Sequence, residues 1–372
     1  MEKYKKYIPF ILILISFMII SVLSIYSAEA LIGGSNYFIK QIIWYFVGFS
    51  VILLIWFIGP SFFIKYSFIF YFIFNFLLLL LLFFGTPIND ARCWFSIPGI
   101  GTFQPSEFMK IILILVLTKI LNEFNEKYTV KTVKLEFLLL LKVGLIVFIP
   151  CILTFLEPDT GNVLIYLLIT FIMLFISGIH IRFFVIFFSF LIVMVISFLI
   201  FYFKFQNTFV NIFGSSFFLR IDRIINWSSK SGFQLEHGLY SIGSAGLLGH
   251  GFTNTPLYFP EANTDFIFAI FASNFGFIGS FILITIFIYF NIKLIKLSLK
   301  TDKYAYKLFL FGMIGMLIYQ EFQNIGMTVG ILPITGITLP FISYGGSSLL
   351  CYMFLIGIVF GIIKEGRSLY KN

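Results

Sequence analysis

Residues 66–84 read YSFIFYFIFNFLLLLLLFF and contain no charged side chain. A helix of about 20 apolar residues crosses the hydrocarbon core of a bilayer, so this stretch predicts a transmembrane helix. Comparable apolar runs recur along the whole chain. They predict ten spans, at residues 8–28, 40–58, 66–84, 107–121, 138–156, 162–178, 183–203, 265–290, 307–326 and 345–363. We therefore predict an all-α integral membrane protein, a bundle of about ten helices that forms one domain over residues 1–372.

The composition supports this class. Of the 372 residues, 60% are apolar and 11% are charged, whereas a soluble chain carries about 25% charged residues. Lipid must therefore be the solvent for much of the surface. The net charge of +9 does not indicate nucleic acid, because the lysines are scattered between apolar runs and form no basic stripe. Cys93, Cys151 and Cys351 are far apart, which indicates neither a disulfide framework nor a zinc site.

The N-terminus has two readings. A basic start at 1–6, an apolar run and the A-x-A sequence Ala28-Glu29-Ala30 are typical of a cleaved signal peptide. The apolar run from Tyr7 to Ser27 is too long for a usual signal core and long enough to span. We favour a retained first helix.

Basic residues predict the orientation. An even number of spans places both termini on one side of the membrane. One set of connecting segments, together with the termini and the adjoining ends of the spans, contains seventeen lysines and arginines, and the other set contains six. The six are Lys40, Arg92, Lys204, Arg220, Arg223 and Lys230. By the positive-inside rule both termini are cytoplasmic, and the long segment 204–264, between the seventh and eighth spans, is extracytoplasmic.

A charged pair opens the fourth predicted span. Glu107 and Lys110 are three residues apart, hence on one helix face, and Pro105 suits the first helical position. A structural ion pair explains both charges without a ligand, and a substrate site that includes Gln104 is the alternative. Arg92, in the preceding external loop, suits phosphate through its guanidinium fork, although contact with solvent or a lipid headgroup explains it about as well.

Two external segments carry paired carboxylates. In Glu157-Pro158-Asp159, Asp159 is expected to cap the next helix, and a divalent cation held by both acids, such as Mg²⁺ or Mn²⁺, is the alternative. Asp265 lies at the mouth of the eighth span. If that segment is helical, Glu261 shares its face, and two carboxylates at a low-dielectric boundary raise each other's pKa, as a general base requires. The competing interpretation is an N-cap at Thr264 or Asp265.

Two further stretches are irregular. Glycines are dense between Gln234 and Gly251, which allows close backbone approach to a ligand or simply tight turns. The chain at 339–348, which includes Ser343, is predicted to be non-helical. At that depth such backbone must be buried in protein or line a cavity.

Taken in order, these motifs resemble the SEDS family (shape, elongation, division and sporulation) over essentially the whole chain. The resemblance rests on six segments. They are Arg92–Trp94 with Gln104–Lys110, Glu157–Gly161, Ile242–Ser244, Pro260–Ala269, Asn324–Met327 and Pro340–Ser348. The chain departs from the family pattern at Asn263, where His is frequent, and at Ser273-Asn274, where a Glu pair is common. It also departs at His237-Gly238 and at His250, where the family often has Gln-Ser and Lys.

The resemblance implies a peptidoglycan glycosyltransferase of the bacterial cytoplasmic membrane, which polymerises lipid II at the outer face. It implies a class B penicillin-binding protein and other elongation or division proteins as partners, with membrane lipid around the bundle. Asp265 falls on the family's essential aspartate, and Glu261 is expected to assist it. The expected substrate-binding residues are Arg92, Gln104, Glu107, Lys110, Arg220, Arg223, Gln234 and Ser343.

The motifs favour the RodA-like branch slightly over the FtsW-like branch. Two other functions remain open, a lipid II flippase and a non-catalytic scaffold of the elongation or division machinery. A flippase needs a polar path through the bilayer, whereas the acidic motifs gather at the outer mouth. A scaffold has no need of Asp265.

Overall fold

The computed structural model describes residues 5–33, 36–88, 91–97, 101–215, 218 and 232–366, and helices dominate it. Ten long helices coincide with the ten predicted spans, which confirms the predicted fold class. They are α1 (Ile8–Ile32), α2 (Tyr37–Ile58), α4 (Ser67–Phe84), α5 (Pro105–Lys127), α6 (Val133–Leu156), α7 (Thr160–Ile176), α8 (Ile181–Lys204), α12 (Ile267–Lys300), α13 (Tyr304–Thr328) and α14 (Gly346–Glu365). The shorter helices are α3 (Pro60–Lys65), α9 (Gln206–Phe213) and α11 (Phe233–Gly243).

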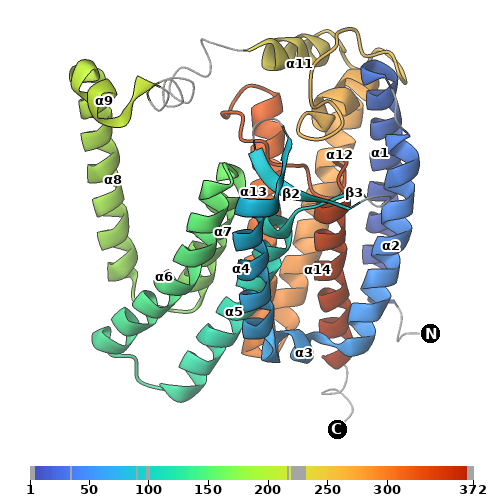
Figure 1. Cartoon of the computed structure of the whole chain (residues 1–372). Coiled ribbons are helices and arrows are strands. Elements are labelled where there is room, and N and C mark those ends of the chain that lie inside the picture. The colour runs from blue at the N-terminus through green and yellow to red at the C-terminus, as the bar shows by residue number, and fades with distance from the viewer. Residues whose placement is uncertain are drawn as a thin grey trace.

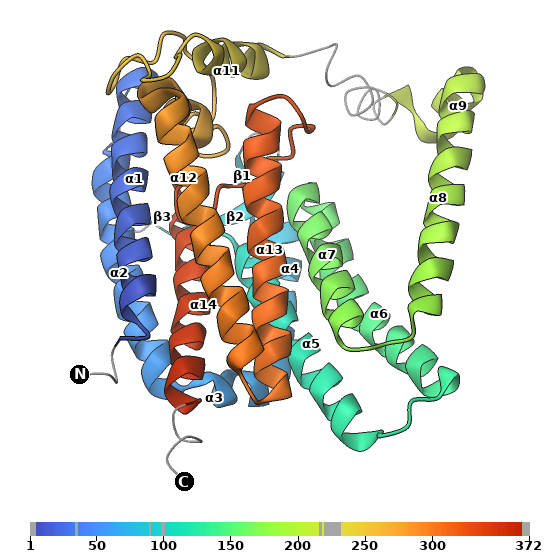
Figure 2. The same cartoon turned by 180° about the vertical axis from the view of Figure 1, so that it is seen from behind.

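The long helices other than α8 form one bundle, in which α1 begins and α14 ends at the same end (Figures 1 and 2). We call this end the terminal end, and the end beneath α11 the capped end. Helix α1 packs against α2 and α12. Its Ser21 hydroxyl donates to the carbonyl of Ile342 at 2.7 Å, and its Glu29 carboxylate accepts from the backbone N–H of Asn36 at 2.7 Å. The A-x-A sequence therefore lies inside a packed helix, which supports the retained-helix interpretation.

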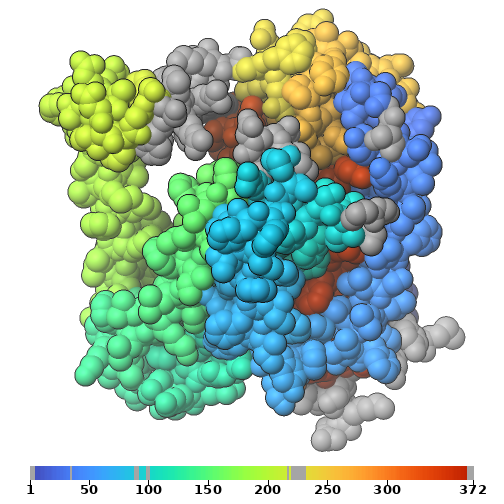
Figure 3. Space-filling model, viewed as in Figure 1, coloured from blue at the N-terminus to red at the C-terminus, as the bar shows by residue number. Residues whose placement is uncertain are grey.

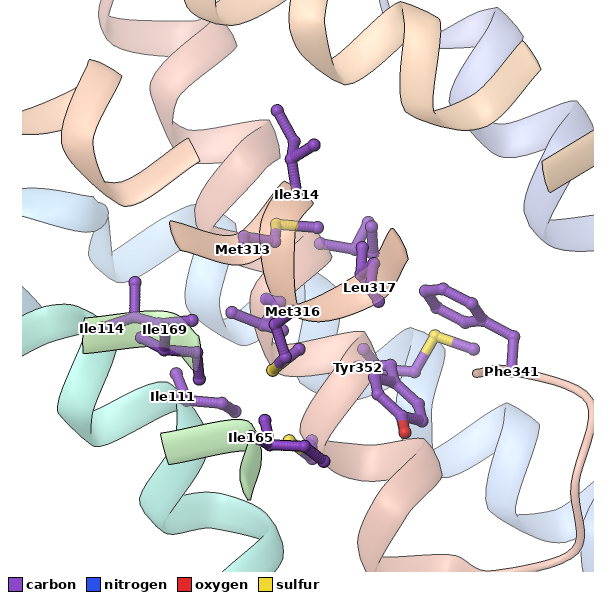
Figure 4. Packing of buried hydrophobic residues seen from close by; sticks show 14 of the residues in the cluster. Ile111, Ile114, Ile165, Ile169, Met313, Ile314, Met316, Leu317, Phe341 and Tyr352 are labelled. Carbon is purple, nitrogen blue, oxygen red and sulfur yellow. The ribbon is translucent and has the colours of Figure 1, made fainter. Parts of the chain in front are cut away.

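Three helices form the centre of the bundle. Helices α5, α7 and α13 pack on one another, and α14 packs against α2 and α5. Figure 4 shows Ile111 and Ile165, from α5 and α7, facing Met316 of α13 beside Tyr352 of α14. These side chains are nearly or fully buried. Interiors of this density fix each helix relative to its neighbours.

Seven of the described helices are long and apolar enough to cross a membrane by length and composition, namely α1, α2, α4, α6, α8, α12 and α14. Helix α7 has only 17 residues, and the central helices α5 and α13 carry charged or amide side chains. Because those polar groups are buried against protein rather than lipid, their cost is reduced.

A small antiparallel sheet replaces the irregular loop that the sequence predicts at 85–106. It consists of β1 (Thr86–Ile88), β2 (Ala91–Ile97) and β3 (Gly101–Phe103), in the order β1-β2-β3. The aromatic pair Phe95 and Phe103 is in register across β2 and β3, as suits residues with high strand propensity. The Ser347 hydroxyl donates to the carbonyl of Thr102 at 3.1 Å and accepts from the N–H of Gln104 at 3.0 Å. These bonds fasten the sheet to the start of α14.

The predicted external segment 204–264 is partly helical, since it contains α9 and α11. Helix α11 packs on α12. Helix α8 stands away from the bundle, and among the described elements its main packing partner is α9. Only Phe184 and Tyr202 of α8 are buried. The space-filling view shows an opening between α8 and α7 (Figure 3).

Candidate functional site

Asp159 organises a polar cluster at the capped ends of α5 and α7. Its carboxylate accepts from the backbone N–H of Asn162 at 3.1 Å, so it caps α7 as predicted. The same carboxylate accepts from the side chains of Gln104, Ser106 and Asn162 at 2.9, 3.0 and 2.7 Å. Asp159 thus ties the start of α5 to the start of α7, and Gln104 is oriented by this contact.

The predicted charged pair is present and buried. The Lys110 ammonium lies 2.9 Å from a Glu107 carboxylate oxygen, and the Lys110 side chain is fully buried. Lys110 also lies over the ring of Tyr352, 5.8 Å from its centroid, and the Tyr352 hydroxyl accepts from the Gln320 side chain at 3.0 Å. The side chain of Asn162 reaches the other Glu107 oxygen at 3.4 Å. The ion pair therefore belongs to a network that links α5, α7, α13 and α14.

Asp265 lies in a turn, and this corrects two predictions. Residues 260–266 form turns before α12 begins at Ile267. Glu261 has a positive φ of 52°, so it does not share a helix face with Asp265. The N-cap of α12 is Phe266, without a side-chain cap. The N-cap interpretation of Thr264 and Asp265 is therefore wrong, and the Asp265 carboxylate is not occupied by capping.

Side chains from distant segments hold the backbone of this turn. Asn324 of α13, fully buried, donates to the carbonyls of Asp265 and Ile337, both at 2.8 Å. The Ser343 hydroxyl donates to the carbonyl of Thr264 at 2.7 Å. The Gln234 side chain donates to the carbonyl of Pro260 at 3.1 Å. Ser343 and Gln234 thus support the turn that carries Asp265, a role that sequence reasoning missed.

The glycine-rich stretch around Gly249 approaches protein backbone. Gly276 interrupts α12 with a φ of 63°, and a Cβ added there would lie 2.4 Å from the backbone nitrogen of Gly249. The N–H groups of His250 and Gly251 donate to the carbonyls of Ser273 and Asn274 at 2.9 and 3.2 Å. Gly246, Gly249 and Gly251 have positive φ values of 59°, 85° and 95°. Of the two predicted roles for these glycines, tight turns are therefore the one observed, and the turns pack against the kink in α12 (Figure 2).

The Asp265 carboxylate is half-buried beside Gly336. A Cβ added to Gly336 would lie 3.5 Å from the Oδ2 atom of Asp265, and Gly336 has a φ of 72°. Burial, and then the negative charges of Glu261 and Asp159, together raise the pKa of Asp265 to about 8. A carboxyl group with this pKa can both accept and release a proton near neutral pH.

Gly336 also lines a small cavity of about 50 Å³, together with residues of the Asp159 cluster. Its walls include Gln104, Glu107, Asn162 and Gln320. The cavity connects the surroundings of Asp265 with the buried ion pair of α5. It is large enough for water-sized groups, and a sugar would need the walls to move apart.

Glu157 is a second buried carboxylate, at the end of α6. Burial raises its pKa to about 9, with a further contribution from the charge of Asp159. Neither carboxylate oxygen has a hydrogen-bond partner within the described residues. Over these same residues, no group of three or more His, Cys, Asp or Glu side chains could hold a metal ion.

Among the described residues, the predicted cations Arg92 and Lys110 have different surroundings. Arg92 projects from β2 and is exposed, on the sheet that leads into Gln104. Lys110 is buried and paired within the bundle. Arg220 and Arg223 lie outside the described residues.

Comparison with known proteins agrees with this arrangement. The FtsW/RodA/SpoVE family model, described as cell cycle protein, matches residues 4–368. The chain is 34% identical to the probable peptidoglycan glycosyltransferase FtsW of Wigglesworthia glossinidia brevipalpis, covering 96% of this chain and 92% of that protein. It is 32% identical to stage V sporulation protein E of Bacillus subtilis, and the match covers 75% of this chain and 73% of that protein. It is 30% identical to the peptidoglycan glycosyltransferase MrdB of Helicobacter pylori, and the match covers 95% of this chain and 88% of that protein.

Solved structures share the fold. One of them shows the structural coordination of polymerization and crosslinking by a peptidoglycan synthase complex. A chain of that structure superposes on this protein with a TM-score of 0.77 at 24% identity, covering 96% of this chain and 98% of that one. Together with the sequence matches over nearly the full length, this places the protein: the chain is a multi-pass membrane protein that belongs to the FtsW/RodA/SpoVE family of cell cycle proteins.

Proposed function

We propose that this protein is a peptidoglycan glycosyltransferase that polymerises lipid II, with Asp265 as the general base. The proposal rests on the backbone contacts of Asp265 and on the environment of its carboxylate. Its backbone is fixed by Asn324, and its carboxylate is free of helix capping and has a pKa of about 8. The names of the FtsW and MrdB relatives support the reaction class.

The reaction joins the 4-hydroxyl of an acceptor sugar to the anomeric carbon of the donor, and undecaprenyl pyrophosphate leaves. The leaving group departs as a stabilised anion, so activation of the hydroxyl is the larger task. A positioned carboxylate that accepts the hydroxyl proton in the transition state contributes about 10²–10⁴-fold. In this scheme Asp265 accepts that proton, and Glu261 and Asp159 keep its pKa high through their charge.

The donor pyrophosphate requires cations. Arg92 is exposed on β2 and offers a bidentate fork to phosphate oxygens, with Arg220 or Arg223 as further candidates. Lys110 is fully buried and paired with Glu107. A direct role for Lys110 therefore requires the bundle to open at the cavity between α5, α7 and α13. In the structure as it stands, Lys110 and Glu107 order the polar network beneath the site.

The polyprenyl tail of lipid II needs a lipid-facing entrance. The opening between α8 and α7 provides one (Figure 3), because most side chains of α8 are apolar and only Phe184 and Tyr202 are buried. We assign the capped end to the extracytoplasmic side and the terminal end to the cytoplasm, from the asymmetry of seventeen against six basic residues. The pyrophosphate and sugars then lie at the capped end, next to Asp265.

A crosslinking enzyme is the expected partner, namely a class B penicillin-binding protein. The structural relative in a complex that coordinates polymerization and crosslinking supports this assembly. Relatives named FtsW and MrdB are similar to the chain at 34% and 30% identity, which fits a role in division or in elongation. The motifs favour elongation.

The decisive experiment uses the Asp265→Asn variant of the full chain, purified with its cognate class B penicillin-binding protein and incubated with lipid II. Asn preserves size and polarity but accepts no proton from the sugar. The variant should fold and bind its partner, and should produce at least about 100-fold less glycan polymer. Asp302→Asn is the matched control, because Asp302 lies between α12 and α13 at the terminal end. Near-normal polymerisation by the folded Asp265→Asn variant would refute the proposed base, while lipid II transport without any polymer would favour the flippase.

A further inference from the structure

A groove at the terminal end of the bundle lies between the last turns of α5 and the first turns of α6. Its volume is about 300 Å³, and its floor consists of isoleucine, phenylalanine and leucine side chains. Its polar lining is Glu123, Lys127, Tyr128 and Lys142. The groove is separated from Asp265 by the length of α5, so it does not belong to the catalytic site.

Lys142 is unusual among the lysines of this end. It is the tenth residue of α6, about 14 Å along the helix from Val133 at 1.5 Å per residue. It is exposed, and within the described part of the chain it has no carboxylate partner. Lysines near it are engaged, since Lys119 donates to a carbonyl at 2.8 Å and Lys131 to another at 3.0 Å. A cation within a membrane span and without a protein partner requires one from its surroundings.

We propose that this groove binds an anionic glycerophospholipid, with the phosphodiester between Lys127 and Lys142. Two lysines and Glu123 give the groove a net charge of +1, which matches the single negative charge of phosphatidylglycerol. The acyl chains have an apolar track on the same face of α6, because Leu138 and Leu145 lie on either side of Lys142 along the helix and are 51% and 67% exposed. A basic pocket between transmembrane helices above an apolar surface is the arrangement that recognises such headgroups.

The position of the groove agrees with this ligand. It lies at the terminal end, which faces the cytoplasmic leaflet in the orientation proposed above. Lysine side chains reach several ångströms along apolar surface toward the headgroup layer. Lys142 from α6 and Lys127 from the end of α5 can therefore approach one phosphate from two sides. The lipid would join α5, which carries Glu107 and Lys110, to α6.

The experiment is native mass spectrometry of the full chain, delipidated in detergent and titrated with phosphatidylglycerol or phosphatidylethanolamine. Each lysine near a lipid phosphate contributes about five-fold in affinity, so Lys127→Gln and Lys142→Gln should each weaken phosphatidylglycerol binding about five-fold and together about 30-fold. Lys134→Gln is the matched control, because Lys134 is exposed in the first turn of α6 but does not line the groove. It should change binding less than two-fold.

Three outcomes would overturn the proposal. Equal loss in the Lys134→Gln control would show unspecific attraction to a basic surface. Tighter binding of phosphatidylethanolamine would show that Glu123 selects the headgroup ammonium. Complete displacement of the lipid by millimolar inorganic phosphate would show a site for free anions. Melting temperatures of all variants identify any that fail to fold, and the double variant Lys127→Leu, Lys142→Leu then repeats the test with apolar side chains that suit the membrane.

Discussion

Glu261→Gln should move the pH dependence of lipid II polymerisation toward acid pH. Burial first, and then the charges of Glu261 and Asp159, raise the pKa of Asp265 to about 8. A general base acts only when it is deprotonated, so the rate follows the ionised fraction of Asp265. Removal of the Glu261 charge lowers the pKa of Asp265 and enlarges that fraction at neutral pH.

The magnitude follows from the pKa. With a pKa of about 8, about one Asp265 side chain in eleven is ionised at pH 7 and about one in a hundred at pH 6. For the unmodified protein, kcat/KM should therefore rise nearly tenfold from pH 6 to pH 7, reach about half of its maximum near pH 8, and level off above about pH 9. Glu261 is exposed, and solvent weakens its effect, so its removal should shift the midpoint by about half a pH unit. At pH 6.5 the variant would then have about three times the relative rate of the unmodified protein.

The assay is the initial rate of glycan polymer formation at low lipid II concentration, measured from pH 6 to pH 9 and scaled to each protein's own plateau. Scaling separates a change in pKa from a loss of activity, which Glu261→Gln would also cause if Glu261 contacts substrate. Glu236→Gln is the matched control, since Glu236 is an exposed carboxylate of α11 and is not among the charges that act on Asp265. A profile that is flat between pH 6 and pH 8, or an identical midpoint in Glu261→Gln, would refute the assignment of Asp265 as a base with a raised pKa.

Three further predictions concern the support of the site, the donor and the orientation. Asn324→Ala removes the two hydrogen bonds that fix the Asp265 and Ile337 carbonyls. It should lower kcat, measured at saturating lipid II, about 10–100-fold with little change in KM. An increase in KM with unchanged kcat would contradict a positioning role. Arg92→Ala should raise KM for lipid II about tenfold or more, the loss expected for one charged hydrogen bond, with unchanged folded yield; if only yield falls, Arg92 is structural. In intact cells a membrane-impermeant maleimide should label a cysteine at position 229 and spare one at 368, and the reverse pattern would invert the topology.

The spans were predictable because their signal is local. A run of about 20 apolar residues is sufficient evidence for a crossing, and each predicted run coincides with a helix. The ends were less predictable. Helix α5 continues to Lys127, beyond the predicted 121, and α12 continues to Lys300, beyond 290. These extensions are polar helical turns, and hydropathy cannot distinguish them from loops.

Contacts between residues close in sequence were predictable at the candidate site, and its long-range geometry was not. The Asp159 cap and the Glu107–Lys110 pair depend on spacing of three residues, and both are present. The position of Asp265 depends on contacts with segments about 60 to 80 residues away, through Asn324 and Ser343. Local rules assign an aspartate before an apolar helix to the N-cap. Here these long-range hydrogen bonds fix the turn instead, and the carboxylate is left for chemistry.

The long helices that look least like membrane spans lie around the candidate site. Helices α5, α7 and α13 are the three that fall outside the length and composition expected of a span. They nevertheless pack on one another in the middle of the bundle, because a helix surrounded by protein does not need a fully apolar surface. Their polar residues, including Lys110, Asn162 and Asn324, are buried and hydrogen-bonded to one another or to the turn that carries Asp265. Polar side chains are costly to bury within a membrane unless they are paired with one another. In this chain the helices that depart from span-like hydropathy therefore contain the residues that hold the turn of Asp265, the proposed base.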